Sequence, residues 1–548
     1  MKTNLEKFYL LIFFGILMYL GPSNLWDHKL SHDFPYGYLA SDTFQQQTRA
    51  EGIMAAGNYR YEPFFIVKGF RDAVGYYTPV LHHLGILLHY ASGVPLYDTI
   101  YFMVFFAAIL GAFVMYVIIG SYNKQIAILS LPLSILIFSN KSFIGFLWGH
   151  WASITAQLFL ISSFWAMSKL HIGNMEIILG LFLGAVAMTH TPILIHVALF
   201  IILYSVFLSL TGRFDLAYAK KMVIAGLIAG LISIYNLFIF YNGFMVVNPY
   251  KFEVSLDWGG TPIFYMSDFG WLLVPIIIGV AAGLLLIKKS PIPVIPGVYM
   301  IFAGYTNYIG FGIRAFQPRL LWPIYLSFFF GLGIYMLIKY IPQKFRYVSV
   351  YATCALSIVL LLGAIPLPNV MTYSKVSTPG LMDLKHWEAF RWLSQNTPED
   401  AKIYFFYGDV YDQDAILRNS MRFHAQVVPQ DFVMSIQNRT IKRVYKSEVP
   451  ADHAAGAPYF KSFLKMGLHL RETKDPLLTE DYLDICLFDY MVFDIATRQP
   501  VLAEYNKLIA AELLKKSYIT HVYGNENDYV FILRNNNVGA DCIEQREF

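Results

Sequence analysis

Long apolar stretches recur along this chain up to about residue 365, and they restrict what it can fold into. A helix needs about 20 mostly apolar residues to cross the hydrocarbon core of a bilayer. The segments that meet or approach this length are residues 8–24, 99–119, 125–139, 151–168, 175–189, 193–211, 222–241, 271–287, 293–308, 320–338 and 347–365. We therefore predict an α-helical polytopic membrane protein with about eleven transmembrane helices.

The overall composition supports this prediction. Of the 548 residues, 56% are hydrophobic, 17% are aromatic and only 14% are charged, whereas soluble proteins average about 25% charged residues. The formal net charge of +4 is spread along the chain, without a basic run or an aromatic RNA-binding signature. We expect membrane lipids as the surroundings of the protein and no nucleic acid as a partner.

The basic residues of the short loops predict how the chain is oriented in the membrane. Lys and Arg accumulate in alternate connections, as expected for cytoplasmic loops. The residues concerned are Lys2, Lys7, Lys124, Lys169, Arg213, Lys220, Lys221, Lys288, Lys289, Lys339, Lys344 and Arg346. This alternation holds only if 175–211 forms two spans that meet at His190-Thr191-Pro192. The N-terminus is then cytoplasmic, and the chain after about residue 366 is extracytoplasmic, on the side called outer here.

Two regions follow from this layout. Residues 1–368 form the transmembrane domain, with 25–98 as a large first outer loop, and residues 369–548 form an extracytoplasmic α/β domain. In the second region the patterns predict an amphipathic helix in 381–400, strands in 401–409 and 489–497, and a hairpin in 520–535. Because the first loop and the C-terminal domain lie on the same side, they can share one site.

The three cysteines show no metal-binding spacing. Cys354, Cys486 and Cys542 form no CxxC pair, which argues against a metal cluster or a disulfide framework. A single bridge between Cys486 and Cys542 is compatible with an extracytoplasmic domain, and two free thiols are an equal alternative.

Ionisable side chains of the first region gather in the predicted outer loops. They are Asp33, Asp42, Arg49 and Glu51 in the first loop, His150 in the next, His190 in the third, and Arg314 and Arg319 in the fifth. Polar groups at membrane depth are costly and usually face a cavity or one another. Their gathering on one side therefore predicts a functional site on the outer face.

Each of these residues also has a purely structural explanation. Asp42 can serve as a helix N-cap, for which Asp is strongly preferred. Arg49 and Glu51 can pair with a neighbouring loop, and His150 can belong to an interfacial aromatic belt. His190 can cap a broken helix, and the two arginines can extend to lipid headgroups.

Several stretches resemble one family of membrane enzymes. In the first outer loop, Asp42 begins a helix-like run to Gly57-Asn58-Tyr59, which the segment YYTPVLHHL (76–84) follows. A later segment, RAFQPRLLWP, carries Arg314 and Arg319. This layout resembles the GT-C superfamily of membrane glycosyltransferases, which includes oligosaccharyltransferases, protein mannosyltransferases and aminoarabinose transferases.

The resemblance implies a donor sugar on a polyprenyl phosphate, transferred with inversion to an acceptor on the outer side. It makes Asp42 the candidate base that takes the proton of the acceptor. Arg314 and Arg319 become candidate ligands of the donor phosphate, because a guanidinium binds two phosphate oxygens at once. Asp33 is a rival base, and Arg49, His150 and His190 are further pocket candidates.

The sequence also departs from the oligosaccharyltransferases. It has no WWDYG-type motif, since LDWGG at 256–260 stands ahead of the last spans, and its second outer loop offers His150 where those enzymes have paired acidic residues. Peptide asparagine as the acceptor and dependence on a metal are therefore not indicated. Whether a divalent metal takes part stays open, as does the choice of a glycan, a lipid or a protein as acceptor.

Two other functions fit parts of the pattern. A non-catalytic relative could keep the same scaffold and use its outer domain to bind or assemble a surface polymer or a protein complex. A secondary transporter fits less well, because transporters are expected to show paired halves and broken helices near the midplane.

Overall fold

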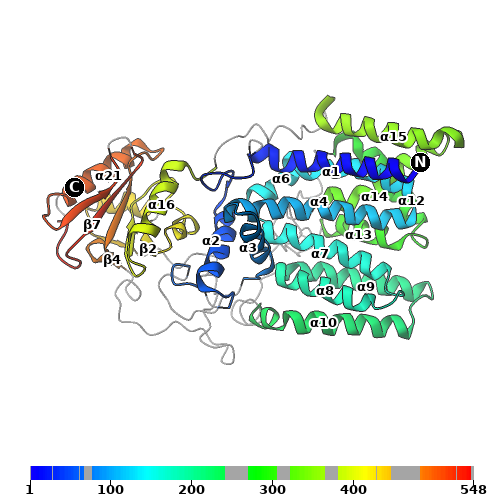
Figure 1. Ribbon diagram of the computed structural model, residues 1–548, viewed down its shortest axis with the longest axis horizontal. Helices are drawn as coiled ribbons and strands as arrows, with labels where there is room; N and C mark the ends of the chain where they lie inside the picture. Colours follow the sequence, from blue (N-terminus) through cyan, green and yellow to red (C-terminus); the bar gives the residue numbers. More distant parts are fainter. Residues whose placement is uncertain are drawn as a thin grey trace. The chain divides into compact units, whose positions relative to one another are not determined.

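The protein divides into two compact units. The computed structural model describes residues 2–26, 29–60, 62–66, 77–240, 269–304, 321–364, 380–427, 429–445, 482–525 and 528–544. Of these, the residues up to 31, 77–240 and 269–364 form the first unit, called the helical unit here. Residues 32–66 and 380–544 form the second, called the sheet unit. Figure 1 shows the elements of both units along the chain.

Helices make up the helical unit. Its α-helices are α1 (Lys2–Trp26), α3 (Val80–Ser92), α4 (Leu96–Tyr122), α5 (Lys124–Ser130), α6 (Asn140–Leu147), α7 (Trp151–Ser168), α8 (Met175–Thr189), α9 (Leu194–Leu210), α10 (Leu216–Phe240), α12 (Leu273–Leu285), α13 (Pro291–Ala303), α14 (Trp322–Ile338) and α15 (Gln343–Val359). Each span predicted from the sequence overlaps one of them. A 3₁₀ helix, Leu131–Phe138, continues α5, where Pro132 lacks the N–H that a regular α-helix would use.

Five of the described helical segments are long and apolar enough to cross a membrane: Leu5–Pro22, Leu96–Tyr122, Thr191–Leu210, Leu216–Ile239 and Gln343–Leu362. Shorter apolar helices lie at Lys124–Phe138, Met175–Thr189, Gly270–Leu285, Pro291–Ala303 and Trp322–Ile338. The multi-pass membrane architecture is thus confirmed, while the number of spans stays a prediction. The break that was expected near His190 is present, because α8 and α9 are separate helices joined by the 3₁₀ turn Thr191–Ile193.

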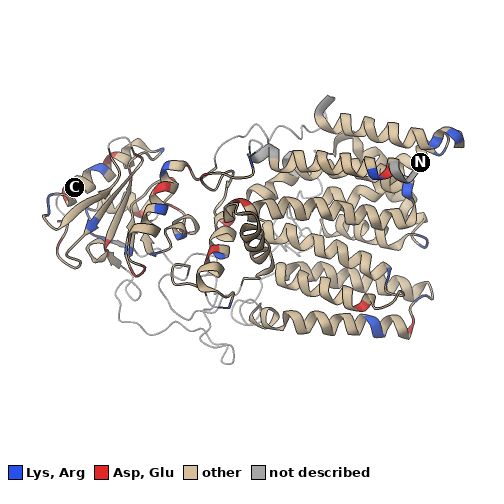
Figure 2. Cartoon of the chain, viewed as in Figure 1, with Lys and Arg blue, Asp and Glu red and all other residues tan. Residues whose placement is uncertain are grey.

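The basic loops of the helical unit are connected to one another. Lys221 donates to the carbonyl of Leu170 (Nζ–O 2.9 Å), and Arg213 donates to the carbonyl of Lys288 (Nη1–O 3.2 Å). Figure 2 shows Lys and Arg gathered at the end of this unit where the N-terminus lies. The loops that the charge pattern assigned to the cytoplasm therefore share one end of the bundle, although the side of the membrane on which this end lies stays a prediction.

The sheet unit is built on a five-stranded mixed sheet in the order β2-β1-β5-β7-β6. Its strands are β1 (Lys402–Phe405), β2 (Phe423–Gln426), β5 (Tyr490–Asp494), β6 (Ile519–Tyr523) and β7 (Val530–Asn535). Strands β2, β1 and β5 are parallel, whereas β7 runs antiparallel to both β5 and β6. The predicted strands in 401–409 and 489–497 and the hairpin in 520–535 are confirmed as β1, β5 and β6–β7.

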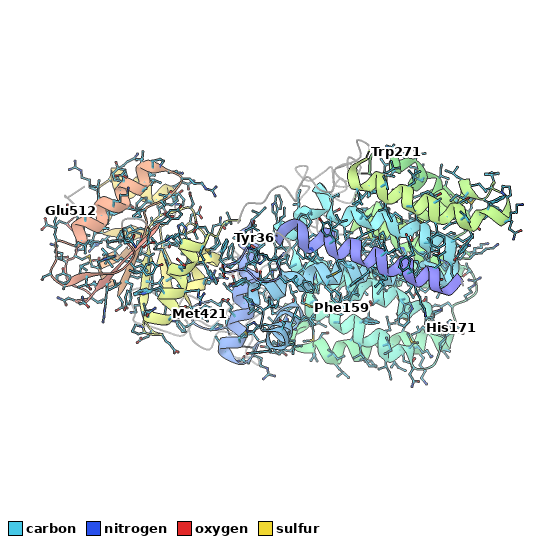
Figure 3. The ribbon with its side chains drawn as sticks, turned by 45° about the horizontal axis from the view of Figure 1, so that its top comes forward. Tyr36, Phe159, His171, Trp271, Met421 and Glu512 are labelled. Carbon is cyan, nitrogen blue, oxygen red and sulfur yellow. A yellow bond between two sulfur atoms is a disulfide. The ribbon has the colours of Figure 1, made fainter. Side chains whose placement is uncertain are left out.

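The sheet unit also contains helices and a second sheet. The helices are α2 (Ser41–Ala56), α16 (Leu384–Asn396), α17 (Asp414–Leu417), α18 (Pro429–Gln437) and α21 (Pro500–Leu513), and a second, two-stranded sheet pairs β3 (Arg443–Tyr445) with β4 (Tyr482–Asp484). The core contains Tyr404 of β1, Phe406 just after β1, and Met491 and Phe493 of β5. Figure 3 draws the side chains, with Met421 and Glu512 labelled in this unit and Phe159 and His171 in the helical unit.

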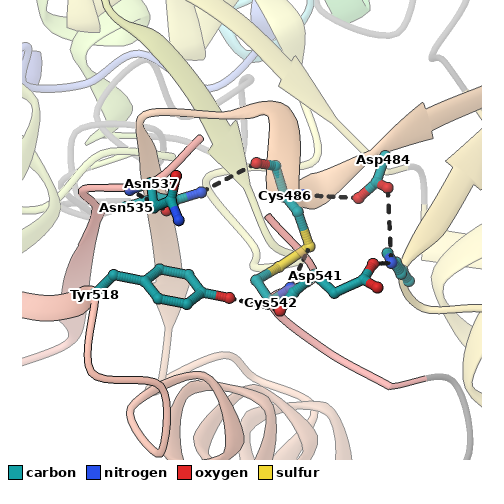
Figure 4. The surroundings of a disulfide bond; sticks show 8 residues. Asp484, Cys486, Tyr518, Asn535, Asn537, Asp541 and Cys542 are labelled. Atoms are coloured by element: carbon teal, nitrogen blue, oxygen red, sulfur yellow. Dashed lines mark hydrogen bonds and ion pairs between the residues drawn. A yellow bond between two sulfur atoms is a disulfide. The ribbon is translucent and has the colours of Figure 1, made fainter. Parts of the chain in front are cut away.

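A disulfide closes the end of the sheet unit. Cys486 and Cys542 are bonded, with Cα atoms 5.6 Å apart (Figure 4). Cys354 is the free cysteine and is buried in α15. The carbonyl of Cys486 accepts hydrogen bonds from the Asn535 side chain and from the Gly539 backbone. Of the two alternatives left by the sequence, the bridge is therefore the one observed. It fits an oxidising, extracytoplasmic compartment.

The first outer loop divides between the two units. Residues 32–66 belong to the sheet unit, while α3, which was expected to lie within the loop 25–98, packs on α4 in the helical unit. The two compact units thus combine segments from different parts of the chain, while the predicted boundary between residues 368 and 369 lies outside the described residues and stays a prediction. The helix that contains Asp42 belongs to the same compact body as the C-terminal strands.

Candidate functional site

Helix α2 carries the polar segment that contains Asp42. Gln, Arg, Glu and Ala favour helix along this stretch, and the helix ends at Gly57, whose left-handed backbone (φ 66°) is the usual glycine C-cap. The N-cap residue is Ala40, without a side-chain cap, so Asp42 is not the N-cap residue. It lies half-buried in the first helical turn, where the positive end of the helix dipole favours a negative charge.

Several polar side chains of α2 are buried. Gln47 is 0% exposed and Arg49 is 2% exposed. Arg49 forms an ion pair with Glu62 (Nη1–Oε1 2.8 Å), so the expected pairing with a neighbouring loop holds for this residue. A buried charge must be paired in this way, because an uncompensated one would cost several kcal/mol.

Gln47 joins α2 to the C-terminal part of the sheet unit. Its Nε2 donates to Oδ1 of Asn419, just after α17, and to Oε1 of Glu51 on the next turn of its own helix, each at 2.7 Å. Glu51 therefore accepts a hydrogen bond from its own helix. Burial raises the pKa of Glu51 to about 7, and the hydrogen bond from Gln47 opposes the rise.

A second connection lies just before α2. Tyr38 and Gly380 form a parallel β-bridge, and the N–H of Leu381 donates to the carbonyl of Tyr38 at 2.8 Å. Gly380 has φ 98°, and a Cβ at this position would overlap the backbone of Tyr38. Only glycine fits here. Asp33, the rival base, is exposed in a bend earlier in this segment.

The two histidine candidates lie in the helical unit. His190 stands between α8 and the 3₁₀ turn, and the preceding carbonyl of Thr189 accepts a hydrogen bond from Thr78 (Oγ1–O 2.7 Å), which precedes α3. His150 precedes α7, with its ring centroid 6.4 Å from that of Trp148. The structure thus places Thr78, which belongs to the YYTPVLHHL segment, next to the helix break at His190.

The arginine candidates, Arg314 and Arg319, lie outside the described residues. The chain that follows them is held firmly: the backbone N–H of Leu321 donates to Oε1 of Gln157 at 2.7 Å, and Tyr325 also donates to this oxygen at 3.3 Å. Gln157 is fully buried in α7. The sequence did not indicate Gln157, because nothing in the pattern of an apolar helix marks which polar residue will accept a distant backbone N–H.

Among the residues that the structure describes, no group of three or more His, Cys, Asp or Glu side chains is arranged to hold a metal ion. The described candidates divide between the units: Asp33, Asp42 and Arg49 belong to the sheet unit, and His150 and His190 to the helical unit.

Asn419 is a further residue that the sequence did not indicate, since its partner Gln47 is 372 positions away.

Comparison with known proteins gives matches at the level of structure. No protein-family model matches the sequence, and no curated protein matches it. The oligosaccharyltransferase of Archaeoglobus fulgidus, in its apo form, superposes with a TM-score of 0.55 at 12% identity, over 91% of this chain and 72% of that one.

Two further structures are similar over nearly the whole chain. ArnT from Cupriavidus metallidurans, bound to undecaprenyl phosphate, gives a TM-score of 0.54 at 10% identity and covers 96% of this chain and 98% of its own. The mycobacterial arabinofuranosyltransferase AftD gives 0.53 at 12% identity and covers 97% of this chain but 40% of its own. The resemblance read from the sequence is therefore confirmed at the level of the fold, which this chain shares with these three membrane proteins.

Proposed function

We propose that the protein is a membrane glycosyltransferase that transfers a sugar, with inversion, from a polyprenyl-phosphate-linked donor to an acceptor on the extracytoplasmic side. One observation carries the proposal. A chain with the fold of ArnT, whose structure holds undecaprenyl phosphate, places Asp42 in the first turn of a helix that is fixed on two sides.

Asp42 is the proposed general base. The acceptor oxygen attacks the anomeric carbon of the donor sugar and loses its proton to the Asp42 carboxylate. The bond between that carbon and the phosphate oxygen breaks, and its electron pair leaves with the polyprenyl phosphate. Because attack comes from the face opposite the leaving group, the anomeric configuration inverts. A base at this position must be ionised, which the N-terminal end of α2 favours.

Arg314 and Arg319 are the proposed ligands of the donor phosphate. Negative charge develops on the phosphate oxygens as the sugar leaves, and guanidinium groups in a water-poor site stabilise that charge strongly. Their assignment comes from the sequence segment alone. The acceptor class and the sugar are left to experiment.

The test is turnover of defined donors by the purified protein in lipid nanodiscs. A panel of polyprenyl-phosphate sugars is supplied with extracted lipid and glycan acceptors, with and without divalent ions, and donor consumption is followed by mass spectrometry. We expect Asp42→Asn to lower turnover by about 10²–10⁴-fold, the usual contribution of a general base, with an unchanged melting temperature. Asp33→Asn, an exposed carboxylate in the same segment, is the matched control.

Three results would change the proposal. If Asp33→Asn abolishes turnover while Asp42→Asn does not, the base is Asp33. If turnover requires an added divalent ion, a metal belongs to the mechanism. If the wild-type protein consumes no donor under any of these conditions, the transferase proposal is wrong, and a scaffold that binds a surface polymer or protein becomes the better description.

A further inference from the structure

Helix α2 is tied to the C-terminal part of the sheet unit on both sides of Asp42. Before the helix, the backbone of Tyr38 pairs with Gly380 and Leu381. After Asp42, the side chain of Gln47 bonds Asn419. These contacts connect segments that are far apart in the sequence, so they are tertiary and not local.

A second hydrogen bond fixes the orientation of each amide group in the Gln47–Asn419 pair. The Gln47 amide nitrogen donates to Asn419 and to Glu51, each at 2.7 Å, so its two hydrogens are both used. Asn419, 5% exposed, is itself held by its Nδ2, which donates to the carbonyl of Ile416 at 2.8 Å. Neither amide can therefore rotate without breaking a second hydrogen bond.

The positions of Gln47 and Asp42 on α2 explain why the Gln47–Asn419 bond would affect Asp42. Gln47 lies about 140° around the helix axis from Asp42, at about 100° per residue. Gln47 can thus bind the C-terminal segment while Asp42 lies on a different face of the same rigid rod. A shift or rotation of α2 against the sheet would move the Asp42 carboxylate as well.

We infer that Gln47 and Asn419 are positioning residues for the transfer reaction, and that the C-terminal domain holds the candidate base in place through α2. The inference rests on the proposed function, in which Asp42 is the base. A misplacement of a reacting group by about 1 Å can cost about 100-fold in rate. The C-terminal domain is then part of the catalytic apparatus and not an appended binding module.

The experiment uses the full-length protein and the donor found active in the turnover assay. Asn419→Leu removes the acceptor with little change in size, and Gln47→Met removes the donor. We expect each variant to lower kcat by about ten- to a hundredfold while the donor KM changes little. The two losses should be clearly less than additive in the double variant, because both substitutions remove the Gln47–Asn419 bond, although each also removes one further hydrogen bond, to Glu51 or to Ile416.

Two readouts separate positioning from a loss of folding. In an Asp42→Asn background, Asn419→Leu should cause no further fall in the residual turnover, whereas general unfolding would lower it again. Amide hydrogen exchange of residues 41–56 should rise in the single variants, while exchange of β5 stays unchanged. The matched controls are Asn396→Leu and Gln437→Met, exposed residues of the sheet unit that should leave kcat unchanged.

The outcomes distinguish the two proposals. A wild-type protein without donor turnover overturns the proposed function, and the positioning role with it. If the wild type is active and Asn419→Leu and Gln47→Met keep its kcat, only the positioning role is wrong. Additive losses in the double variant, or a further loss in the Asp42→Asn background, also overturn it.

Discussion

The imidazole of His386 lies between two carboxylates in the sheet unit. Its Nδ1 is 2.7 Å from Oδ2 of Asp383, the N-cap of α16, and its Nε2 is 3.2 Å from Oδ2 of Asp494 at the end of β5. Burial lowers the pKa of His386, but the hydrogen bonds to the two carboxylates outweigh burial and raise the pKa to about 9. The ring is therefore protonated at neutral pH, and it links a helix to the central strand of the sheet.

This arrangement predicts a pH dependence of stability. Because folding raises the pKa of His386, its contribution is fully present below about pH 6.5, the ordinary pKa of histidine, and is lost as the pH rises through about 9. The contribution is at most about 3 kcal/mol. We expect the melting temperature of the wild type to fall between pH 6 and pH 10, and His386→Gln to be less stable than the wild type mainly at pH 6. An equal deficit of His386→Gln at both pH values would contradict this account.

At the scale of elements, glycines allow two helices of the helical unit to pack closely. A Cβ at Gly333 of α14 would overlap the backbone of Pro275, and one at Gly279 of α12 would overlap the backbone of Phe329. Small residues at a crossing let helix backbones approach, which is how membrane helices gain packing contacts in the absence of a hydrophobic driving force.

A one-carbon substitution tests this crossing. We expect Gly333→Ala to lower the melting temperature and the yield of folded protein, with a cost of about 1–3 kcal/mol from overpacking. Gly226→Ala in α10 is the control, since nothing lies within 4 Å of a Cβ there. Thermal unfolding in the same detergent compares the two variants. Equal melting temperatures would mean that α12 and α14 can separate without a measurable cost.

At the scale of the whole molecule, the charge pattern predicts the side on which each unit lies. The connected basic loops mark one end of the helical unit, which the pattern assigns to the cytoplasm. The sheet unit contains the Cys486–Cys542 disulfide, which is expected outside the cytoplasm. Both observations favour an extracytoplasmic C-terminal domain.

Labelling of introduced cysteines tests this orientation. Cys354 is buried and the other cysteines are bonded, so an exposed new thiol can be detected against the native ones. In intact cells, a membrane-impermeant maleimide should label Asn396→Cys but not His171→Cys, which should react only after permeabilisation. Labelling of His171→Cys in intact cells would reverse the predicted topology.

By itself, the sequence determined the local elements of this protein. Apolar length predicted a helix for each expected span, and the loop charges predicted the break at His190-Thr191-Pro192. The strand-like stretches at 401–409 and 489–497 and the polar tip of the hairpin at 520–535 predicted β1, β5 and the β6–β7 pair. Such patterns are readable because a membrane span or a buried strand depends on the hydrophobicity of consecutive residues.

Only the tertiary structure decided how these elements combine. In the folded protein, α2 belongs to the same unit as the C-terminal strands, and Gln47 and Arg49 are buried. Cys486 and Cys542 form a disulfide and are not free thiols, and Gln47 donates a hydrogen bond to Asn419. These features depend on pairs of residues far apart in the chain, and a polar residue carries no local sign of which distant group will satisfy its hydrogen bonds. For that reason Asp42 could be proposed from the sequence, while the contacts that hold its helix could not.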